Sequence, residues 1–337
     1  MGTTSKAQTL GVLIPTYRRH KDLLNGLEAL KKQKRMPDQV VVTVRDTDTD
    51  TQAALKQYDA GALPLQIATV SIPGVVAAMN AGLAAITTDI TVLTDDDTTP
   101  FPDWLERIEA LFASDARIGG VGGRDFQAIH PGSEPIVGIL QPFGRIIGNH
   151  HLAVGPARDV QILKGANCAF RTAPLKAIGF DERMAGKGAQ VNWEMAICLA
   201  FLRAGWRLVF DPAIAVDHHV APRADNDLNH RGIFGAEGHR EAVHNYTLLL
   251  WEHFPPQQKL LFLLWFTLVG THGEPGLVGL MLGLLKRRPE AFARFQATQQ
   301  GRFAGIRTTR QTPRREVPAP GNSTGESSSF SARTLGK

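Results

Sequence analysis

The sequence predicts an α/β protein with a doubly wound, mostly parallel sheet, and three observations support this prediction. Short apolar or β-branched runs, which are typical of buried strands, recur through the first two thirds of the chain. Between these runs, leucines and other apolar residues recur at helical spacing. Apolar residues also make up 43% of the 337 residues, which is ample for a core. Because such sheets bind ligands at the carboxyl ends of their strands, functional residues are expected there.

The first part of the chain contains four expected strands with helices between them. Each strand is short and apolar, and the first ends at a proline. The expected strands are residues 11–15, 40–44, 65–70 and 90–93. The expected helices are residues 20–36, residues 75–85 and a helix marked by Trp104, Leu105, Ile108, Leu111 and Phe112. This alternation indicates a parallel sheet.

The remainder of the chain is less regular. Residues 122–164 are rich in Gly, Pro and His, and predict either a long functional loop region or a small antiparallel excursion. A helix at 193–204, closed by Gly205, precedes expected strands at 207–210 and 214–216. We expect four segments: a flexible stretch at 1–9, an α/β domain at 10–225, a helical, apolar region at 226–306 and a disordered basic tail at 307–337.

Charge and cysteine content exclude several classes of protein. The net charge of +5 is modest, and residues 307–337 contribute most of it through six basic and two acidic residues. The rest of the chain is nearly neutral, so we expect no nucleic-acid partner. Cys168 and Cys198 are too few for a disulfide scaffold, and residues 1–9 are polar, unlike a signal peptide. These features predict a cytoplasmic protein.

Three consecutive carboxylates, Asp95, Asp96 and Asp97, directly follow the expected strand at 90–93. Carboxylates this close repel one another unless a cation or solvent offsets their charge. In an extended turn Asp95 and Asp97 point to the same side, and hard divalent cations bind such oxygen ligands and clamp a substrate diphosphate. The alternative interpretation is a solvated acidic turn that leads into the next helix.

The order of several short motifs resembles family 2 glycosyltransferases over about residues 10–220. The motifs are Pro15-Thr16-Tyr17-Arg18-Arg19, Arg45-Asp46, Pro73-Gly74, Asn80-Ala81-Gly82, Asp95-Asp96-Asp97, Phe101-Pro102-Asp103-Trp104, Gly165-Ala166-Asn167-Cys168-Ala169-Phe170-Arg171, Gly179-Phe180-Asp181, Asn192-Trp193-Glu194, Arg203-Ala204-Gly205-Trp206, Asp211-Pro212 and Asp217-His218. The resemblance implies a GT-A fold, which combines a Rossmann-like nucleotide half with an acceptor half. It also implies a nucleotide-diphosphate sugar donor, a divalent cation (Mn²⁺ or Mg²⁺) and transfer with inversion.

The resemblance also assigns roles to residues of this chain. It places Asp97, Asp95 and His218 at the metal, with His219 as the alternative histidine. It places Pro15, Thr16, Tyr17, Asp46, Asn80, Asp95 and Asp96 at the donor, with Asp48 as the alternative to Asp46. It places Gly165, Ala166, Asn167 and Trp193 at the donor sugar or the acceptor, and pairs Arg171 with a phosphate or with Asp181. Met79 stands where the family often has an arginine, which removes one cation near the phosphates.

The catalytic base departs from the family's pattern. Family members usually have Glu-Asp at the start of the helix that ends in Arg-Ala-Gly-Trp, and here Trp193 and Glu194 occupy those two positions. Glu194 therefore keeps the second carboxylate, displaced by about 1.5 Å because its side chain is one methylene longer. It is the expected base, although a first-turn carboxylate that favours the helix dipole is the plain alternative. The Trp193 substitution also keeps a second function open, a non-catalytic protein that binds a sugar nucleotide.

Two apolar stretches near the C-terminus, at 260–270 and 276–285, are each about half as long as a membrane-spanning helix. With the basic residues that follow them, they fit a hairpin at a membrane interface through 259–288, or packing on the catalytic domain or in a dimer. The motifs at 244–247, 275–277 and 301–305 resemble bacterial transferases that build surface polysaccharides on lipid carriers. The Gln-x-x-Arg-Trp motif of processive synthases is absent, so we expect addition of one sugar to a glycan or lipid-linked acceptor at the cytoplasmic membrane face.

Overall fold

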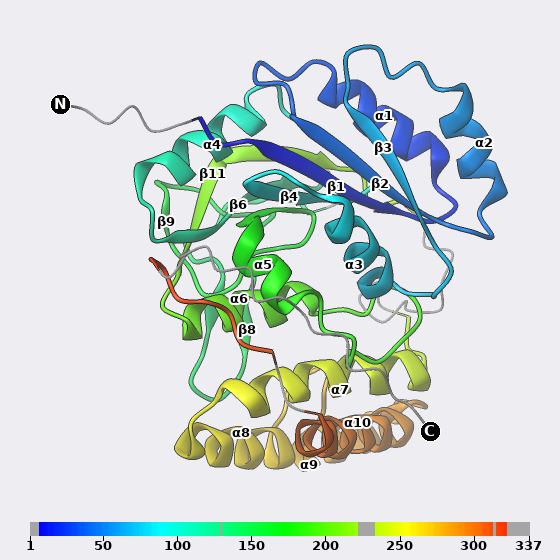
Figure 1. Ribbon diagram of the computed structural model, residues 1–337. Coiled ribbons are helices and arrows are strands. Elements are labelled where there is room, and N and C mark those ends of the chain that lie inside the picture. The colour runs from blue at the N-terminus through cyan, green and yellow to red at the C-terminus, as the bar shows by residue number, and fades with distance from the viewer. Residues whose placement is uncertain (1–6, 129, 222–232, 313–314, 322–337) are drawn as a thin grey trace, which may run out of the picture.

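The computed structural model describes residues 7–128, 130–221, 233–312 and 315–321 (Figure 1). Its centre is one large sheet with the strand order β3-β2-β1-β4-β10-β6-β11-β5, and β9 pairs with β11 beside this path. The strands are β1 (Leu10–Thr16), β2 (Gln39–Arg45), β3 (Leu65–Val70), β4 (Ile90–Thr94), β5 (Thr98–Pro100), β6 (Ile118–Phe126), β9 (Arg158–Asp159), β10 (Asn167–Arg171) and β11 (Arg207–His218). A separate antiparallel pair joins β7 (Ile139–Leu140) to β8 (Ile146–Ile147).

Most strands of the sheet run in the same direction. β3, β2, β1 and β4 run in one direction, as do β6 and β11, while β10 lies antiparallel between β4 and β6. β5 and β9 are antiparallel to β11. The predicted α/β fold with a mostly parallel sheet is therefore confirmed.

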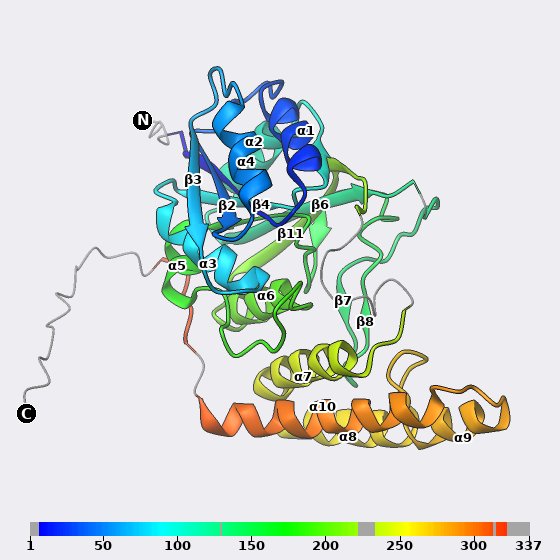
Figure 2. The same cartoon turned by 90° about the vertical axis from the view of Figure 1, so that its right-hand side faces the viewer.

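Helices cover both faces of the sheet. In Figures 1 and 2, α1, α2 and α4 lie on one side and α3, α5 and α6 on the other. These helices are α1 (His20–Leu30), α2 (Thr49–Gln57), α3 (Val75–Ala85), α4 (Trp104–Ser114), α5 (Thr172–Ile178) and α6 (Trp193–Arg203). Alternate strand residues feed the two cores: Val12 and Ile14 pack with α1 and α4, whereas Leu13 packs with α3. Parallel strands buried on both faces explain the continuous apolar runs in the sequence.

Four C-terminal helices form a further layer beyond α6 (Figure 2). They are α7 (Ala236–His253), α8 (Pro256–Leu268), α9 (Leu277–Leu285) and α10 (Ala291–Gln311). Tyr246, Phe262 and Phe266 are buried in the same apolar cluster as Trp193 and Phe201, so this layer shares a core with the sheet. No helix among the described residues is long and apolar enough to cross a membrane.

Part of the tail expected to be disordered at 307–337 is ordered, whereas residues 313–314 and 322–337 lie outside the described residues. Residues 307–311 complete α10, where Thr308 hydrogen-bonds with His244 at 2.9 Å. Beyond α10, the indole of Trp206 donates to the carbonyl of Pro318 at 2.7 Å, and Val317 packs on the core. Polar contacts hold these residues in place, which a composition rich in Arg, Thr and Pro does not reveal.

The sequence did not predict the strand β6, because four of its nine residues are glycine, which has a low strand propensity. Its glycines lie where large side chains from neighbouring elements approach. A Cβ on Gly119 would lie 2.7 Å from Trp206, and one on Gly120 would lie 2.8 Å from the ring of Phe170. Packing therefore selects glycine there.

Other boundaries also moved. The helix expected at 20–36 ends at Leu30, and α2 was not expected at all. The two strands expected at 207–210 and 214–216 are one strand, β11, with an irregularity between Asp211 and Ala215. Of the two interpretations of 122–164, the antiparallel excursion is present as β7 and β8.

We predict that Gly305→Ala destabilises the protein. α10 packs closely on α7, and a Cβ at Gly305 would lie 2.6 Å from the carbonyl oxygen of His244. Alanine favours a helix by about 1 kcal/mol over glycine, but this clash with backbone should reverse the sign and cost about 1–3 kcal/mol. Urea unfolding measures the difference. Gly273→Ala is the control, because its nearest neighbour, Thr271 Oγ1, would lie 4.0 Å away. Equal stabilities for the two variants would contradict the prediction.

Candidate functional site

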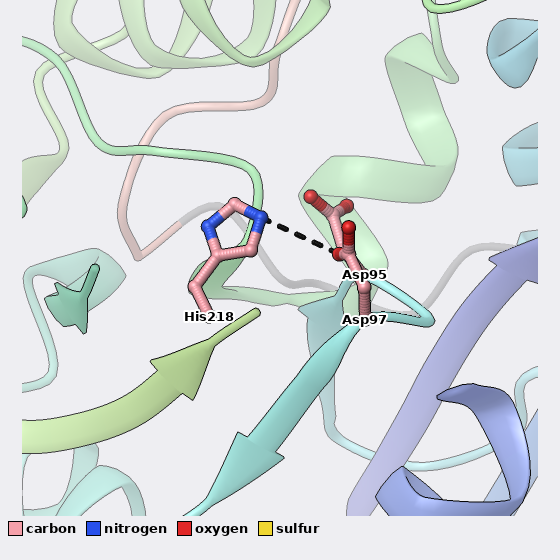
Figure 3. A group of neighbouring side chains, drawn as sticks. All are labelled: Asp95, Asp97 and His218. Atoms are coloured by element: carbon pink, nitrogen blue, oxygen red, sulfur yellow. Dashed lines mark ion pairs between the residues drawn. The ribbon is translucent and has the colours of Figure 1, made fainter. Parts of the chain in front are cut away.

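Three potential metal ligands meet where β4 and β11 end. Asp95 and Asp97 stand in the turn between β4 and β5, and His218 is the last residue of β11. β5 pairs with β11, which places His218 opposite Thr98. One ligand atom from each of the three side chains lies within 4.8 Å of the other two (Figure 3). His218 Nε2 lies 3.4 Å from Asp97 Oδ1.

The ring of His218 is held from behind by Asp125 of β6. His218 Nδ1 donates to Asp125 Oδ2 at 3.2 Å, which leaves Nε2 facing Asp97. Asp125 is fully buried and also accepts hydrogen bonds from Lys164 and Gln127. A carboxylate behind a histidine in this way fixes the ring orientation that a metal ligand needs. His219 instead hydrogen-bonds with Thr99 at 2.9 Å, so the structure brings His218 to the carboxylates.

The end of β1 and the chain after β11 close the acidic turn. Asp96 accepts hydrogen bonds from Thr16 and Arg19, each at 2.8 Å. Arg19 also lies 3.2 Å from Asp97 Oδ2, which accepts the backbone N–H of Ala221 at 2.8 Å. Val220 reaches this position with a φ of 48°, a conformation that costs energy for a β-branched residue. The turn is therefore fixed by contacts from two distant segments of the chain.

These contacts shift the pKa values of the site. Burial alone would lower the pKa of His218, but its contacts with Asp125 and Asp97 raise it to about 9. Burial would raise the pKa of Asp97, but the adjacent His218 and the charge of Arg19 lower it to about 2. Burial raises the pKa of Asp96 to about 7 despite the charge of Arg19. Protonated His218 and Arg19 thus act as cations between carboxylates.

The donor set fits a divalent cation. Asp97 Oδ1 is buried and makes no hydrogen bond with any described residue, so an acceptor is left for another partner. Asp95 is partly exposed and has a raised pKa because of burial and the charge of Asp97. Two carboxylates and one imidazole suit Mn²⁺, and the carboxylates alone suit Mg²⁺. A cation here would replace the proton on His218 as the charge that offsets the two aspartates.

Glu194 stands in the first turn of α6 and is partly exposed. Burial raises the pKa of the nearby Cys168 thiol, and the charges of Cys198, Glu194 and Asp95 raise it further. Gln190 and Asn192, just before the helix, have positive φ values of 41° and 75°. The amide of Gln190 accepts from Val76 and donates to Met184, which ties this strained entry to α3.

Trp193 and Gly165 form one packing unit. A Cβ on Gly165 would lie 2.3 Å from the indole of Trp193, so glycine is required for the ring to settle there. Trp193 also packs against Phe180, with ring centroids 5.5 Å apart, and is 8% exposed. The side chain assigned to the sugar or acceptor is therefore mainly a core residue that supports the start of α6. Ala166 is buried, and its carbonyl accepts from Thr94.

Two asparagines that the sequence assigned to ligands instead brace the fold. Asn80 exchanges hydrogen bonds with the backbone of Phe180, at 2.9 and 2.8 Å. Asn167 is fully buried, where it accepts from the indole of Trp104 and donates to the carbonyls of Arg124 and Ile214. Both amide groups are therefore engaged in hydrogen bonds within the fold.

Two other assignments differ from the expectation, whereas Asp46, Pro15 and Tyr17 keep exposed or partly exposed positions. Arg171 donates to the carbonyls of Ile118 and Phe112, and Asp181 pairs with Arg183 instead. Asp48 is buried, caps α2 and accepts the N–H of Arg18, so it is structural. Asp46 stays exposed beside Arg45 at the end of β2. Pro15 is partly exposed and Tyr17 exposed at the end of β1.

Sequence reasoning missed Arg19, Asp125 and Lys164. Arg19 stood within the first motif, and its distance from the aspartates along the chain hid their contact. Asp125 and Lys164 lie in the segment expected to be irregular, and only the pairing of β6 with β11 brings Asp125 to His218. The available signal in the sequence was an acidic residue, Asp125, close after a run of glycines.

We predict that metal-free protein loses stability between pH 6.5 and 9. The pKa of His218 is about 9 in the folded chain and 6.5 as the reference value, so the folded state binds the proton more tightly. The stabilisation is complete below pH 6.5 and disappears as the pH rises through 9. Measured by urea unfolding in EDTA, the advantage of wild type over His218→Gln should shrink by about 3 kcal/mol across this range. His219→Gln should keep the wild-type profile; a constant difference for His218→Gln would contradict the prediction.

Comparisons with known proteins agree with this geometry. The family described as glycosyltransferase like family 2 matches residues 7–231. Pre-mycofactocin glycosyltransferases from two strains of Mycobacterium tuberculosis, CDC 1551 / Oshkosh and H37Rv, are 28% identical over 172 residues. That match covers 50% of this chain but only 35% of each relative.

Solved structures share the fold at low identity. The mannosyltransferase PcManGT from Pyrobaculum calidifontis, in complex with GDP-Man and Mn²⁺, is 15% identical with a TM-score of 0.55, covering 91% of this chain and 89% of that one. GalNAc-T7 with UDP, GalNAc and Mn²⁺ is 13% identical with a TM-score of 0.55, covering 76% and 50%. Since the family match spans well over half of the sequence, this chain belongs to the glycosyltransferase family 2 group.

Proposed function

We propose that this chain is a metal-dependent, inverting glycosyltransferase of the hexosyltransferase type. It moves one sugar from a nucleotide-diphosphate sugar to a hydroxyl of a glycan or lipid-linked acceptor. The observation that carries this proposal is the meeting of Asp95, Asp97 and His218 at the carboxyl ends of two sheet strands, in a chain of this family. Two proteins of the same fold, solved with Mn²⁺ and with GDP-Man or with UDP and GalNAc, support it.

Asp95, Asp97 and His218 would hold the divalent cation, Mn²⁺ or Mg²⁺. When bound, the cation offsets the negative charge that grows on the departing nucleoside diphosphate. Asp125 keeps the His218 ring turned toward Asp97, and Lys164 neutralises Asp125. The chain's own contribution is a preformed set of ligands that needs little rearrangement.

The ends of β1 and β2 would form the nucleotide side of the donor site. Pro15, Thr16 and Tyr17 stand at the end of β1, and Asp46 stands at the end of the adjacent β2. Asp96 contributes by fixing the turn, since Thr16 and Arg19 occupy its carboxylate. Arg19, with 18% of its side chain exposed, would also supply positive charge toward the diphosphate. This cation compensates for Met79, which is buried.

Glu194 would act as the general base. Its carboxylate removes the proton from the acceptor hydroxyl, whose oxygen attacks the anomeric carbon from the face opposite the diphosphate. The new bond joins that oxygen to the anomeric carbon, the bond from this carbon to the diphosphate oxygen breaks, and the configuration inverts. The fixed entry to α6 at Gln190 and Asn192 sets the position of Glu194. This fixed backbone would compensate for the side chain of Glu194, which is one methylene longer than the aspartate usual in the family.

The biological setting we propose is cell-surface polysaccharide synthesis at the cytoplasmic face of the membrane. The motifs on α7 and α10 support it. There, Gly301 and Gly305 let the two helices approach closely, and His244 and Thr308 join them. These residues explain why that part of the sequence resembles transferases working on lipid carriers.

We predict that one nucleotide stabilises the protein in a metal-dependent way. Melting temperatures with UDP, GDP, CMP or dTDP, each with and without Mn²⁺, measure this. At about 100 times the dissociation constant the stabilisation should be about 2.7 kcal/mol. Asp97→Ala should abolish the shift because it removes a buried ligand, whereas Asp50→Ala, in the exposed first turn of α2, should keep it. No shift with any nucleotide in wild type would refute the metal–diphosphate site.

We predict that Glu194→Gln abolishes transfer while nucleotide binding survives. Loss of a general base typically lowers the rate by about 10²–10⁴-fold. Release of nucleoside diphosphate from the matching donor measures turnover, and the melting shift measures binding. Glu106→Gln is the matched control, because Glu106 is also a first-turn carboxylate, on α4. Wild-type turnover in Glu194→Gln would exclude this base. Binding with no turnover in wild type would favour the alternative, a non-catalytic sugar-nucleotide-binding protein.

A further inference from the structure

Helices α8 and α9 leave an unusually apolar surface uncovered. On α8, Phe262 and Phe266 are buried, whereas a stripe at helical spacing on the other side is exposed. On α9 only Gly283 is buried, against Ala291 of α10. The exposed side chains, here called the apolar face, are Leu260, Leu261, Leu264, Leu268, Val269, Leu277, Val278, Met281, Leu282, Leu284, Leu285 and, on α10, Phe292 and Phe303.

The apolar face lies at the edge of the molecule. Figure 2 shows α8, α9 and α10 as the layer farthest from the central sheet. Most exposed large apolar side chains of the described residues gather in this layer. Soluble surfaces rarely carry so many together, and such a patch marks a binding partner. Packing on the catalytic domain, one alternative from the sequence, accounts for Phe262 and Phe266 and, in part, for Leu263 and Trp265, but not for the exposed side chains of the apolar face.

A buried ion pair makes the apolar face a fixed shape. Glu274, in the connection between α8 and α9, lies 3.6 Å from Arg302 of α10. Arg302 is 4% exposed, stacks over the ring of Phe266 and donates to its carbonyl. The ion pair and the hydrogen bond of Arg302 therefore attach α8 and the α8–α9 connection to α10. The exposed leucines thus lie on helices that are fixed in position.

The charge beside the apolar face identifies the partner. Lys286, Arg287 and Arg288 follow α9 directly and are all exposed. Between residues 256 and 288, Glu274 is the single acid, and it is paired with Arg302. A second copy docked on the same face would bring these three basic residues, with Lys259, to a surface where the partly exposed Glu290 is the one further acid between residues 256 and 311. Anionic lipid headgroups supply the missing negative charge, and the acyl region accepts the leucines.

We propose that the apolar face of α8 and α9, with Lys286–Arg288 at its border, docks on an anionic lipid bilayer and lies in its interface. The helices of 13 and 9 residues are too short to span it. Lipid binding of this kind needs neither donor nor cation, so it stands or falls independently of the transfer reaction proposed above.

Vesicle flotation of the full chain tests this proposal. Wild type should float with vesicles of phosphatidylcholine and phosphatidylglycerol, and bind those of phosphatidylcholine alone more weakly. The triple variant Leu264→Gln, Met281→Gln, Leu285→Gln should lose binding to both. Its control, Ile72→Gln with Ile136→Gln, changes exposed apolar residues outside the apolar face and should bind like wild type. All replaced side chains are exposed, so melting temperatures should show that both variants fold.

A second variant set tests the basic border. Each basic residue near an anionic surface strengthens binding by roughly fivefold, so replacing Lys286, Arg287 and Arg288 by Gln should weaken it about 100-fold. Binding to neutral vesicles should not change. Lys32→Gln with Lys34→Gln is the matched control on exposed lysines elsewhere. The proposal is overturned if wild type does not float, or if the triple variant at Leu264, Met281 and Leu285 still floats. It is also overturned if wild type is a dimer that binds no vesicles and that the triple variant converts to a monomer.

Discussion

Three adjacent carboxylates at the end of β4 impose the constraint on which the rest of this structure depends. Asp96 and Asp97 are almost fully buried, and unpaired buried charges of like sign are very costly. Cationic side chains from distant segments relieve this cost, Arg19 from the end of β1 and His218 from the end of β11. The same charge balance invites a divalent cation, because the cation can replace the proton that His218 carries. Stability of the metal-free chain and readiness for a metal thus share one cause.

Sheet topology brings these groups together. β4 lies between β1 and the antiparallel β10, while β6 and β11 run parallel on the other side of β10. The short strand β5 follows the acidic turn and pairs with β11. This pairing places His218, the last residue of β11, beside the acidic turn. The strained Val220 lets the chain fold back on Asp97. Much of the site is therefore built from strand ends, where the rigid sheet fixes positions closely.

Local pattern predicted elements that have an apolar run or apolar residues at helical spacing. The observed bounds of β3 and α3 coincide with those expected. Local pattern also selected Asp95, Asp97 and His218, because chemistry and motif order agree there. Local pattern did not reveal β6. Its glycines are required because the side chains of Trp206 and Phe170 occupy the space that a Cβ would need. Local pattern also did not reveal the roles of Asn80 and Asn167. A sequence motif is the same whether the asparagine amide binds a ligand or hydrogen-bonds to other parts of the fold. Such non-local pairing is what a single sequence hides.

The C-terminal layer and the proposed base share one core, which links docking to catalysis. Trp193, adjacent to Glu194, belongs to the same apolar cluster as Phe262 and Phe266 of α8. The buried side of α8 thus belongs to the core that also holds the start of α6, while its opposite side carries the apolar face. A closely packed core deforms little. A bilayer that holds α8 would therefore also hold α6 at a fixed orientation relative to the membrane plane. The hydroxyl of a lipid-linked acceptor stays near the headgroups. The fixed orientation would therefore place this hydroxyl close to the donor sugar before the reaction begins.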